Sequence, residues 1–368
     1  MIPRHPSWGP AMNIVDATAA YEKWLAAAVP LVKRDLKRKH AIMAESAFGF
    51  LRATYYRWCQ KFPDICPELQ SAPRILVVGD LHLENFGTWR DGEARLAWGV
   101  NDFDEAHPGP FANDLVRLAT STLIAIEAGG LAIGPHRAVR EILDGYTAAI
   151  AQAQGHPFVL EENEAELRAI AMSDTRNPQK FWANILKEKP ATPPDDVRAL
   201  LAAHLPDGAP EIAYARRTAG AGSLGIPRFV ATRLVTASRV AREAKRRAPS
   251  SHAWASGGAH DPSHAPQLLA RAIRPTDPFL DIGPEWTLRR LAPHCESIDL
   301  ADIANARERR VVLSAMGRET ANIHRGSKGA PHRIRAWLDK QKPGWLYEAA
   351  GRMAASVRKD WKAWKKTA

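Results

Sequence analysis

The stretch RILVVGDLHLENFGTWRDGEARLAWGVNDFD, residues 74–104, decides the fold that we expect for this chain. Its β-branched apolar start predicts a buried strand over residues 75–78. Residues 86–100 then predict two antiparallel strands that turn at Asp91-Gly92, which is a strong hairpin signal. The stretch therefore predicts a strand, a polar loop and a hairpin that returns the chain to that loop.

Polar side chains lie at both places where this hairpin meets the loop. Asp80 and Asn85 belong to the loop, and Asp102 follows the returning strand. The hairpin would bring Asp102 back beside Asn85, so we expect the three side chains to face one point at the mouth of a sheet. Such a set suits phosphoryl transfer, in which a protein mainly positions groups and neutralises charge. Mg²⁺ prefers hard oxygen ligands and keeps several waters, so two protein ligands suffice.

Three motifs carry a resemblance to known families. GDLHLENFG and NDFDEA, at residues 79–87 and 101–106, resemble the catalytic and metal-binding loops of the protein-kinase-like superfamily in its aminoglycoside and choline kinase style. Together with NDLVRLATS at residues 113–121, they resemble more closely the uncharacterised bacterial family called domain of unknown function 2252. The resemblance extends over about residues 40–330, with gaps.

The resemblance implies a role for each of these polar residues. Asp80 would be the catalytic base or the group that orients a hydroxyl, with His82 beside it. The implied Mg²⁺ ligands are Asn85, Asp102 and Asp104. Asp114, at the start of the next helix, would support the catalytic loop from behind.

A glycine-rich segment, GAGSLG at residues 220–225, follows in the second half of the chain. The extended pattern on both sides favours a strand, a loop and a strand, as in the kinase-like flap over ATP phosphates. The residues that would cradle phosphate are Gly220, Gly222, Ser223 and Gly225. A dinucleotide-binding fingerprint with Glu243 as its acid stays open, as does a glycine-rich hairpin without function.

A cation on the next strand would pair with the α- and β-phosphates. Arg242 and Lys245 are the two candidates, and they point to opposite faces of a strand. We slightly prefer Lys245. A glutamate on a helix, which would hold this cation in the kinase-like arrangement, is not obvious, and the weak candidates are Glu45, Glu285 and Glu296.

The catalytic loop precedes the glycine-rich flap in this chain, whereas kinase-like folds have the reverse order. We therefore expect an α+β, two-lobed protein-kinase-like fold that is circularly permuted, which surface termini permit. The expected parts are residues 1–190 (N-terminal arm, helices and catalytic loop), 197–300 (glycine-flap small lobe) and 301–368 (C-terminal helices). The Pro-rich residues 188–196 predict a linker.

Two further segments have plain structural interpretations. A helix expected from Ala19 to about Lys39 ends in the basic run 33–39, which we interpret as a solvated face. His324 closes a G-x-x-x-A-x-x-H motif that resembles the same bacterial family, and we interpret it as a buried, hydrogen-bonded histidine rather than a catalytic one.

Composition limits the class of protein. The 368 residues carry a net charge of +11. A basic surface can attract anionic partners, but an arginine-rich coding bias gives the same charge, so the charge alone does not make nucleic acid an expected partner. No apolar run approaches the roughly 18 residues of a membrane span, and the first residues do not resemble a secretory signal. Three cysteines without CxxC spacing argue against a disulfide framework or a zinc site and fit a cytoplasmic protein.

The sequence thus predicts an ATP- and Mg²⁺-dependent phosphotransferase that acts on an unknown small-molecule or protein acceptor. Nucleotidyl transfer would use the same parts. A catalytically inactive nucleotide-binding sensor or scaffold is the alternative from another class, because Val78 replaces the usual histidine before Gly-Asp. A metallophosphoesterase ranks lower, because the chain has no Gly-Asn-His run.

Overall fold

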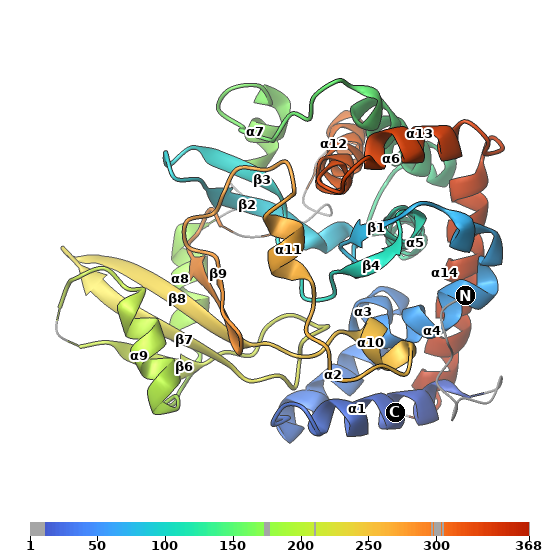
Figure 1. The fold of residues 1–368 in the computed structure, drawn as a ribbon. Helices are drawn as coiled ribbons and strands as arrows, with labels where there is room; N and C mark the ends of the chain where they lie inside the picture. The colour runs from blue at the N-terminus through green and yellow to red at the C-terminus, as the bar shows by residue number, and fades with distance from the viewer. Residues whose placement is uncertain are drawn as a thin grey trace.

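The computed structural model describes residues 12–172, 177–209, 211–295 and 305–367, together with residues 297 and 303. The fold is mixed α+β, as predicted, with a helical part and a six-stranded antiparallel sheet beside it (Figure 1). The expected N-terminal arm before residue 12 and the candidate Glu296 lie outside the described residues. Within them, no helix combines the length and the apolar composition needed to span a membrane.

The helical part is built from helices at both ends of the chain. They are α1 (Ile14–Ala26), α2 (Lys33–Glu45), α3 (Ala47–Ala53), α4 (Tyr55–Ile65), α5 (Ala112–Glu127), α6 (Pro135–Ala151), α7 (Ala165–Ala171), α12 (Ala306–Arg325), α13 (Ala330–Leu338) and α14 (Trp345–Lys365), with the short 3-10 turn η1 (Pro67–Ser71). One core contains Leu115 of α5, Ile142 of α6, Val312 of α12 and Leu346 of α14. The C-terminal helices therefore share their core with helices of the N-terminal half.

The helix predicted from Ala19 to about Lys39 is divided into two helices, α1 and α2, with Pro30 between them. A third helix, α3, begins at residue 47. Ser46 separates α2 from α3, because its backbone is extended and its side chain accepts a hydrogen bond from Gly49 N at 3.0 Å.

Residues 74–110 form two small antiparallel strand pairs. Strand β1 (Arg74–Val77) pairs with β4 (His107–Pro110), and β2 (Phe86–Arg90) pairs with β3 (Leu96–Val100). The hairpin β2–β3 is the predicted one, but the turn is longer than Asp91-Gly92. Its left-handed residue is Ala94, and the Asp91 side chain accepts hydrogen bonds from Glu93 N and Arg95 N. The Asp91 carboxylate therefore closes the turn.

The six-stranded sheet has the order β5–β6–β7–β8–β10–β9 and is antiparallel throughout. Its strands are β5 (Lys189–Pro190), β6 (Ala213–Arg216), β7 (Arg228–Val235), β8 (Ser238–Arg246), β9 (Asp281–Ile282) and β10 (Trp286–Leu291). The Pro-rich segment predicted as a linker thus contributes a short edge strand.

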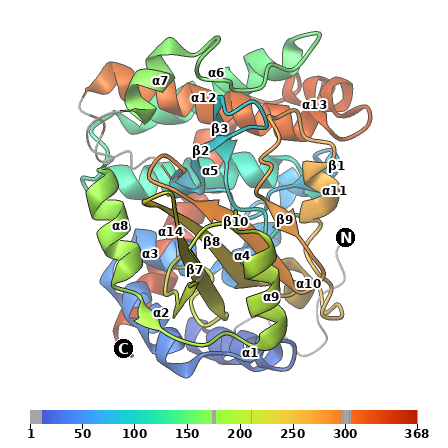
Figure 2. The same ribbon diagram turned by 90° about the vertical axis from the view of Figure 1, so that its left-hand side faces the viewer.

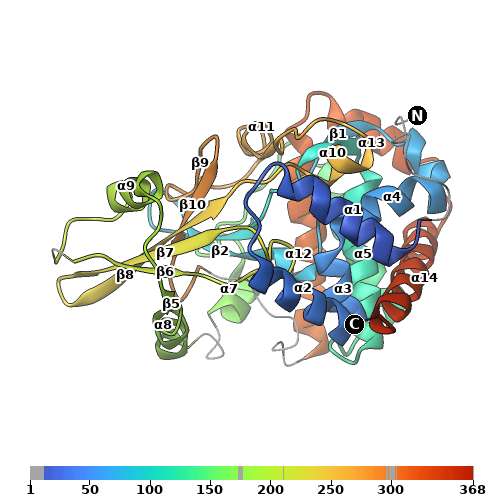
Figure 3. The ribbon, with the colours of Figure 1, turned by 90° about the horizontal axis from the view of Figure 1, so that it is seen from below.

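Helices α8 (Pro178–Leu186) and α9 (Asp195–Ala203) cover opposite faces of this sheet, as Figures 2 and 3 show. Side chains alternate along a strand, so neighbouring residues of β7 face opposite helices. Val230 belongs to the cluster around Phe181 of α8, and Ala231 to the cluster around Val197 of α9. Two short helices, α10 (Ser251–Ala255) and α11 (Ala265–Leu269), lie in the long connection from β8 back to β9.

Candidate functional site

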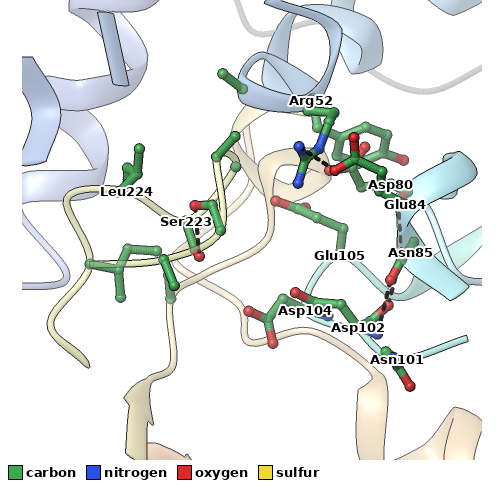
Figure 4. A pocket seen from close by; sticks show the side chains of 18 of the residues that line it. Arg52, Asp80, Glu84, Asn85, Asn101, Asp102, Asp104, Glu105, Ser223 and Leu224 are labelled. Atoms are coloured by element: carbon green, nitrogen blue, oxygen red, sulfur yellow. Dashed lines mark hydrogen bonds and ion pairs between the residues drawn. The ribbon is translucent and has the colours of Figure 1, made fainter. Parts of the chain in front are cut away.

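A pocket of about 440 Å³ lies between the helical part and the sheet. Most of the predicted site residues line it. These are Asp80, His82, Asn85, Asp102, Asp104, Gly220, Gly222 and Ser223. Figure 4 shows Asp102, Asp104 and Glu105 extending into the pocket toward the loop that carries Ser223, with Asp80 beside Arg52. Segments distant in the sequence therefore meet at one site.

Asp80 follows β1 at a turn that is held from behind. The buried carboxylate of Asp114 accepts hydrogen bonds from Val78 N at 2.7 Å and Gly79 N at 2.9 Å. Arg117, one helical turn beyond Asp114, places Nη2 at 2.5 Å and Nε at 3.0 Å from Asp80 Oδ1. Burial raises the pKa of Asp80 above its ordinary value, and the Arg117 charge opposes that rise. The carboxylate is thus fixed in place by a buried cation.

The Asn85 side chain joins the two ends of the predicted polar set. Its amide nitrogen donates to Asp80 O at 3.0 Å and to Asp102 O at 3.2 Å, and its Oδ1 accepts from Asp102 N at 3.0 Å. The structure therefore brings Asp80, Asn85 and Asp102 together as expected. These contacts use both amide protons of Asn85 on backbone, so only a lone pair of Oδ1 is left for another partner.

Lys245 lies against the two aspartates that follow β3. Its Nζ is 3.1 Å from Asp102 Oδ2 and also contacts Asp104 Oδ2. Loss of hydration raises the pKa of Asp102, but the charges of Lys245 and Arg289 outweigh this effect and bring the pKa to about 2. Loss of hydration and the neighbouring charge of Asp102 raise the pKa of Asp104. A cation thus already links the two carboxylates.

The two candidate cations of β8 do point to opposite sides. Arg242 stacks on Phe279, with its guanidinium 4.4 Å from the ring centroid, and donates to Ala241 O. It therefore does not meet Asp102 or Asp104, whereas Lys245 does. Alternation along β8 puts the two side chains on opposite faces, and the face with Lys245 is the one that meets Asp102 and Asp104.

The glycine-rich segment forms the predicted loop between the strands β6 and β7. A Cβ added at Gly222 would lie 3.0 Å from Arg52 O and 3.8 Å from Asp80 Oδ2, so the loop passes next to Asp80. Ser223 Oγ accepts a hydrogen bond from Arg228 Nη2 at 2.7 Å. The backbone bends sharply at both ends of the segment, with φ of 76° at Gly220 and 99° at Gly225.

Behind this loop, one buried glutamate gathers three arginines. Glu243, which is 1% exposed, lies 2.5 Å from Arg217, 3.0 Å from Arg228 and 2.7 Å from Arg289. Burial raises its pKa, but the three arginines overcome this and hold the pKa well below the ordinary value. Glu243 and Lys245 share one face of β8, because they are two residues apart. The cluster therefore adds positive charge to the wall of the pocket.

None of the described glutamates proposed as a helix partner for Lys245 reaches it. Glu45 is exposed at the end of α2, and Glu285 pairs with Arg246. Asp102 and Asp104 take that place. The dinucleotide fingerprint also loses its acid, because Glu243 is buried among arginines on a strand.

His82 and His324 differ in their surroundings. His82 is 8% exposed and lines the pocket, and its Nδ1 has no hydrogen-bond partner among the described residues. Burial and nearby arginines lower its pKa well below the ordinary value, so the ring is neutral. His324 is fully buried between Asp114 Oδ2 at 3.0 Å and Tyr146 OH at 2.9 Å, away from the pocket, as the interpretation of a hydrogen-bonded histidine expects.

Four charged residues of the pocket region were not assigned to the site from the sequence. Lys39 ends the basic run that was expected to be solvated, yet it is 4% exposed and donates to Gly222 O. Arg52 pairs with Glu84, and Arg117 pairs with Asp80. Glu105 accepts from Ser251 N and Oγ, and burial raises its pKa to about 8. The NDLVRLATS motif was the only signal for Arg117.

The chain was compared with known proteins. Residues 31–202 match the model of the family described as "Uncharacterized protein conserved in bacteria (DUF2252)". This match confirms the resemblance to the uncharacterised bacterial family for the part with Asp80 and Asp102, and it does not bear on the kinase-like superfamily. The glycine-rich loop and Lys245 lie beyond the matched residues. No curated protein and no solved structure gives a significant match.

Proposed function

We propose that this protein is an ATP- and Mg²⁺-dependent phosphotransferase with a circularly permuted, kinase-like fold. The observation that carries the proposal is that Gly222 passes beside Asp80, while Lys245 binds Asp102 and Asp104, which line the same pocket. A carboxylate for the acceptor, a loop for phosphate and a cation with acidic partners thus occur together.

The pocket also has a suitable size and charge for a nucleotide. Its volume of about 440 Å³ lies in the range of roughly 300–1,000 Å³ that is usual for ligand pockets. Arg228 and Arg289 line one side of it, and Lys245 adds positive charge there through its contacts with Asp102 and Asp104. The absence of a side chain at Gly222 leaves room between the loop and Asp80, which a Cβ would reduce. These features favour an anionic, phosphate-bearing ligand.

The oxygen atoms present fit Mg²⁺ better than a softer metal. The described residues contain no cluster of three or more His, Cys, Asp or Glu side chains able to hold a metal by themselves. Asp102 and Asp104, with the free lone pair of Asn85 Oδ1, form a smaller oxygen set, and Mg²⁺ commonly relies on one or two carboxylates together with water and phosphate oxygens. When bound there, Mg²⁺ would neutralise charge on the phosphates.

The residues of the chain then have separate tasks. Asp80 orients the acceptor hydroxyl and takes its proton, and Arg117 and Asp114 keep Asp80 and its turn in position. Lys245 binds phosphate oxygens, for which it must exchange part of its contact with Asp102 and Asp104.

The order of the elements supports the permutation. After loop 220–225, strands β7, β8 with its lysine and β10 come in this order along the chain, with the short β9 before β10, and lie next to one another in one sheet. They follow the Asp80 loop in sequence instead of preceding it. Surface termini and exposed connections make such a rearrangement physically acceptable.

One observation favours the alternative of an inactive nucleotide-binding module. Arg117 binds Asp80 through two hydrogen bonds to Oδ1, and its charge opposes the rise in pKa that burial gives this carboxylate, so Asp80 is a weaker base than it would be without Arg117. Both the phosphotransferase and the inactive module would bind nucleotide, but only the phosphotransferase would consume ATP.

Consumption of γ-labelled ATP in the presence of Mg²⁺ tests the proposal, with Asp80→Asn as the decisive variant and exposed Asp144→Asn as its control. We expect turnover that disappears in Asp80→Asn while nucleotide binding persists. Binding without turnover on any acceptor would support the inactive module, and absence of nucleotide binding would refute both.

A further inference from the structure

Lys39 is a buried cation that forms no ion pair with a described residue, although Glu22, Glu105 and Asp80 lie near enough for their charges to act on it. Its Nζ donates to Gly222 O at 3.0 Å, and across the described residues no carboxylate lies within ion-pair distance of it. The ammonium lies 6.0 Å from the ring centroids of both Tyr21 and Tyr56. Because a buried ammonium is costly unless it is paired, and two of its three protons lack a partner in these contacts, Lys39 is suited to receive an anion.

The helix that carries Lys39 is attached to the glycine-rich loop and its flanking strand. Val32 N donates to Gly225 O at 2.8 Å, and Asp35 pairs with Arg216 at 2.6 Å. A Cβ added at Gly225 would lie 2.5 Å from a methyl carbon of Leu36. Helix α2 therefore forms part of the wall of the pocket, beside the loop that connects β6 and β7 (Figure 1).

The position of Gly222 indicates where in the pocket this anion would bind. The Gly222 carbonyl accepts the hydrogen bond from Lys39, and a Cβ at Gly222 would lie 3.0 Å from Arg52 O and 3.8 Å from Asp80 Oδ2. Lys245, the other buried lysine of the site, is bound to Asp102 and Asp104 instead. The two lysines therefore serve different parts of the pocket, and Lys39 serves the part next to Asp80.

We propose that Lys39 binds the terminal phosphate of the nucleotide and gives the pocket its preference for a triphosphate over a diphosphate. This inference rests on the proposed function, because it assumes a nucleotide whose phosphates run toward Asp80. It assigns to α2, a helix outside the predicted catalytic motifs, the recognition of the group that is transferred.

The test compares the affinities of adenylyl imidodiphosphate, a non-hydrolysable ATP analogue, and ADP, both with Mg²⁺, by titration calorimetry. Lys39→Gln removes the charge and retains an N–H donor for Gly222 O. We expect its affinity for the triphosphate analogue to fall about tenfold or more, as for loss of a charged hydrogen bond, while its affinity for ADP stays within about twofold. Lys37→Gln, exposed on the same helix, is the matched control and should change neither.

Other outcomes decide against the inference. If Lys39→Gln lowered the affinities for both nucleotides equally, Lys39 would only stabilise the loop. Unchanged affinities would show that Lys39 does not contact the nucleotide. Lys39→Arg, which keeps the charge, should keep the preference, and Lys39→Met replaces the Gln variant if that protein does not fold. A wild-type protein that binds neither nucleotide would instead overturn the proposed function.

Discussion

Arg117 holds one oxygen of Asp80 and leaves the other toward the glycine-rich loop. Both short contacts, 2.5 Å from Nη2 and 3.0 Å from Nε, are to Oδ1. Oδ2 lies 3.8 Å from the position that a Cβ at Gly222 would take. The pair thus orients the carboxylate as well as neutralising it, because rotation of Asp80 would break both hydrogen bonds. An acceptor hydroxyl would meet Oδ2.

Removal of Arg117 should destabilise the protein strongly. Its side chain is 1% exposed, it also donates to Leu51 O, and it stacks over the Tyr55 and Trp58 rings. Arg117→Met should lower the free energy of unfolding by about 3 kcal/mol, since it leaves a partly buried carboxylate unpaired. Urea unfolding measures this change. In the double variant with Asp80→Asn the loss should be clearly smaller than the sum of the two single losses, and simple additivity would contradict the pairing.

Replacement of Lys245 and replacement of Arg242 should have different effects on nucleotide affinity, although the two residues lie only three positions apart on β8. Lys245→Met should weaken binding of the ATP analogue about tenfold or more, because a charged donor is lost. Arg242→Met should leave the affinity nearly unchanged, since Arg242 stacks on Phe279 outside the site. Titration at a temperature where both variants are folded gives the comparison. Equal effects would place the phosphates elsewhere.

Gly222→Ala should weaken nucleotide binding without unfolding the protein. The added methyl group would lie 3.0 Å from Arg52 O, a backbone atom, so the loop must move and occupy space beside Asp80. We expect the dissociation constant for the ATP analogue to rise several-fold. Gly92→Ala is the control, because nothing lies within 4 Å of its added Cβ. An unchanged constant in Gly222→Ala would mean that phosphate does not pass beneath this loop.

Glu319 should make stability depend on pH between about pH 4.3 and 7. Burial raises the pKa of Glu319 to about 7, whereas an unfolded glutamate has a pKa of about 4.3. Within this interval the folded protein keeps a proton that the unfolded chain has lost, so stability falls as pH rises. Glu319→Gln removes this fall, and its stability relative to wild type should increase with pH by up to about 1.4 kcal/mol per unit, then level off.

Urea unfolding at pH 5 and pH 8 tests this expectation, with Glu348→Gln, exposed on α14, as the control. A stability difference that stays constant between the two pH values would show that Glu319 is ionised in the folded state. Glu319 Oε1 accepts a hydrogen bond from Val100 N at 3.3 Å, which glutamine can preserve.

The sequence alone determined the parts of the site that depend on neighbouring residues. Apolar alternation and a turn signal predicted the β2–β3 hairpin, and its register places Asp102 beside Asn85. The strand–loop–strand character around Gly222 was likewise a local pattern. These predictions succeed because hydrogen bonds along a hairpin connect residues that the sequence itself brings close.

Only the tertiary structure decided which distant segments meet. The docking of the sheet on the helical part brings Gly222 to Asp80 and selects Lys245 over Arg242. The same docking buries Lys39, which has the pattern of a solvated helix face. A charge pattern on one helix does not contain the surface that will cover it, because that surface comes from another segment whose position depends on the packing of the whole core.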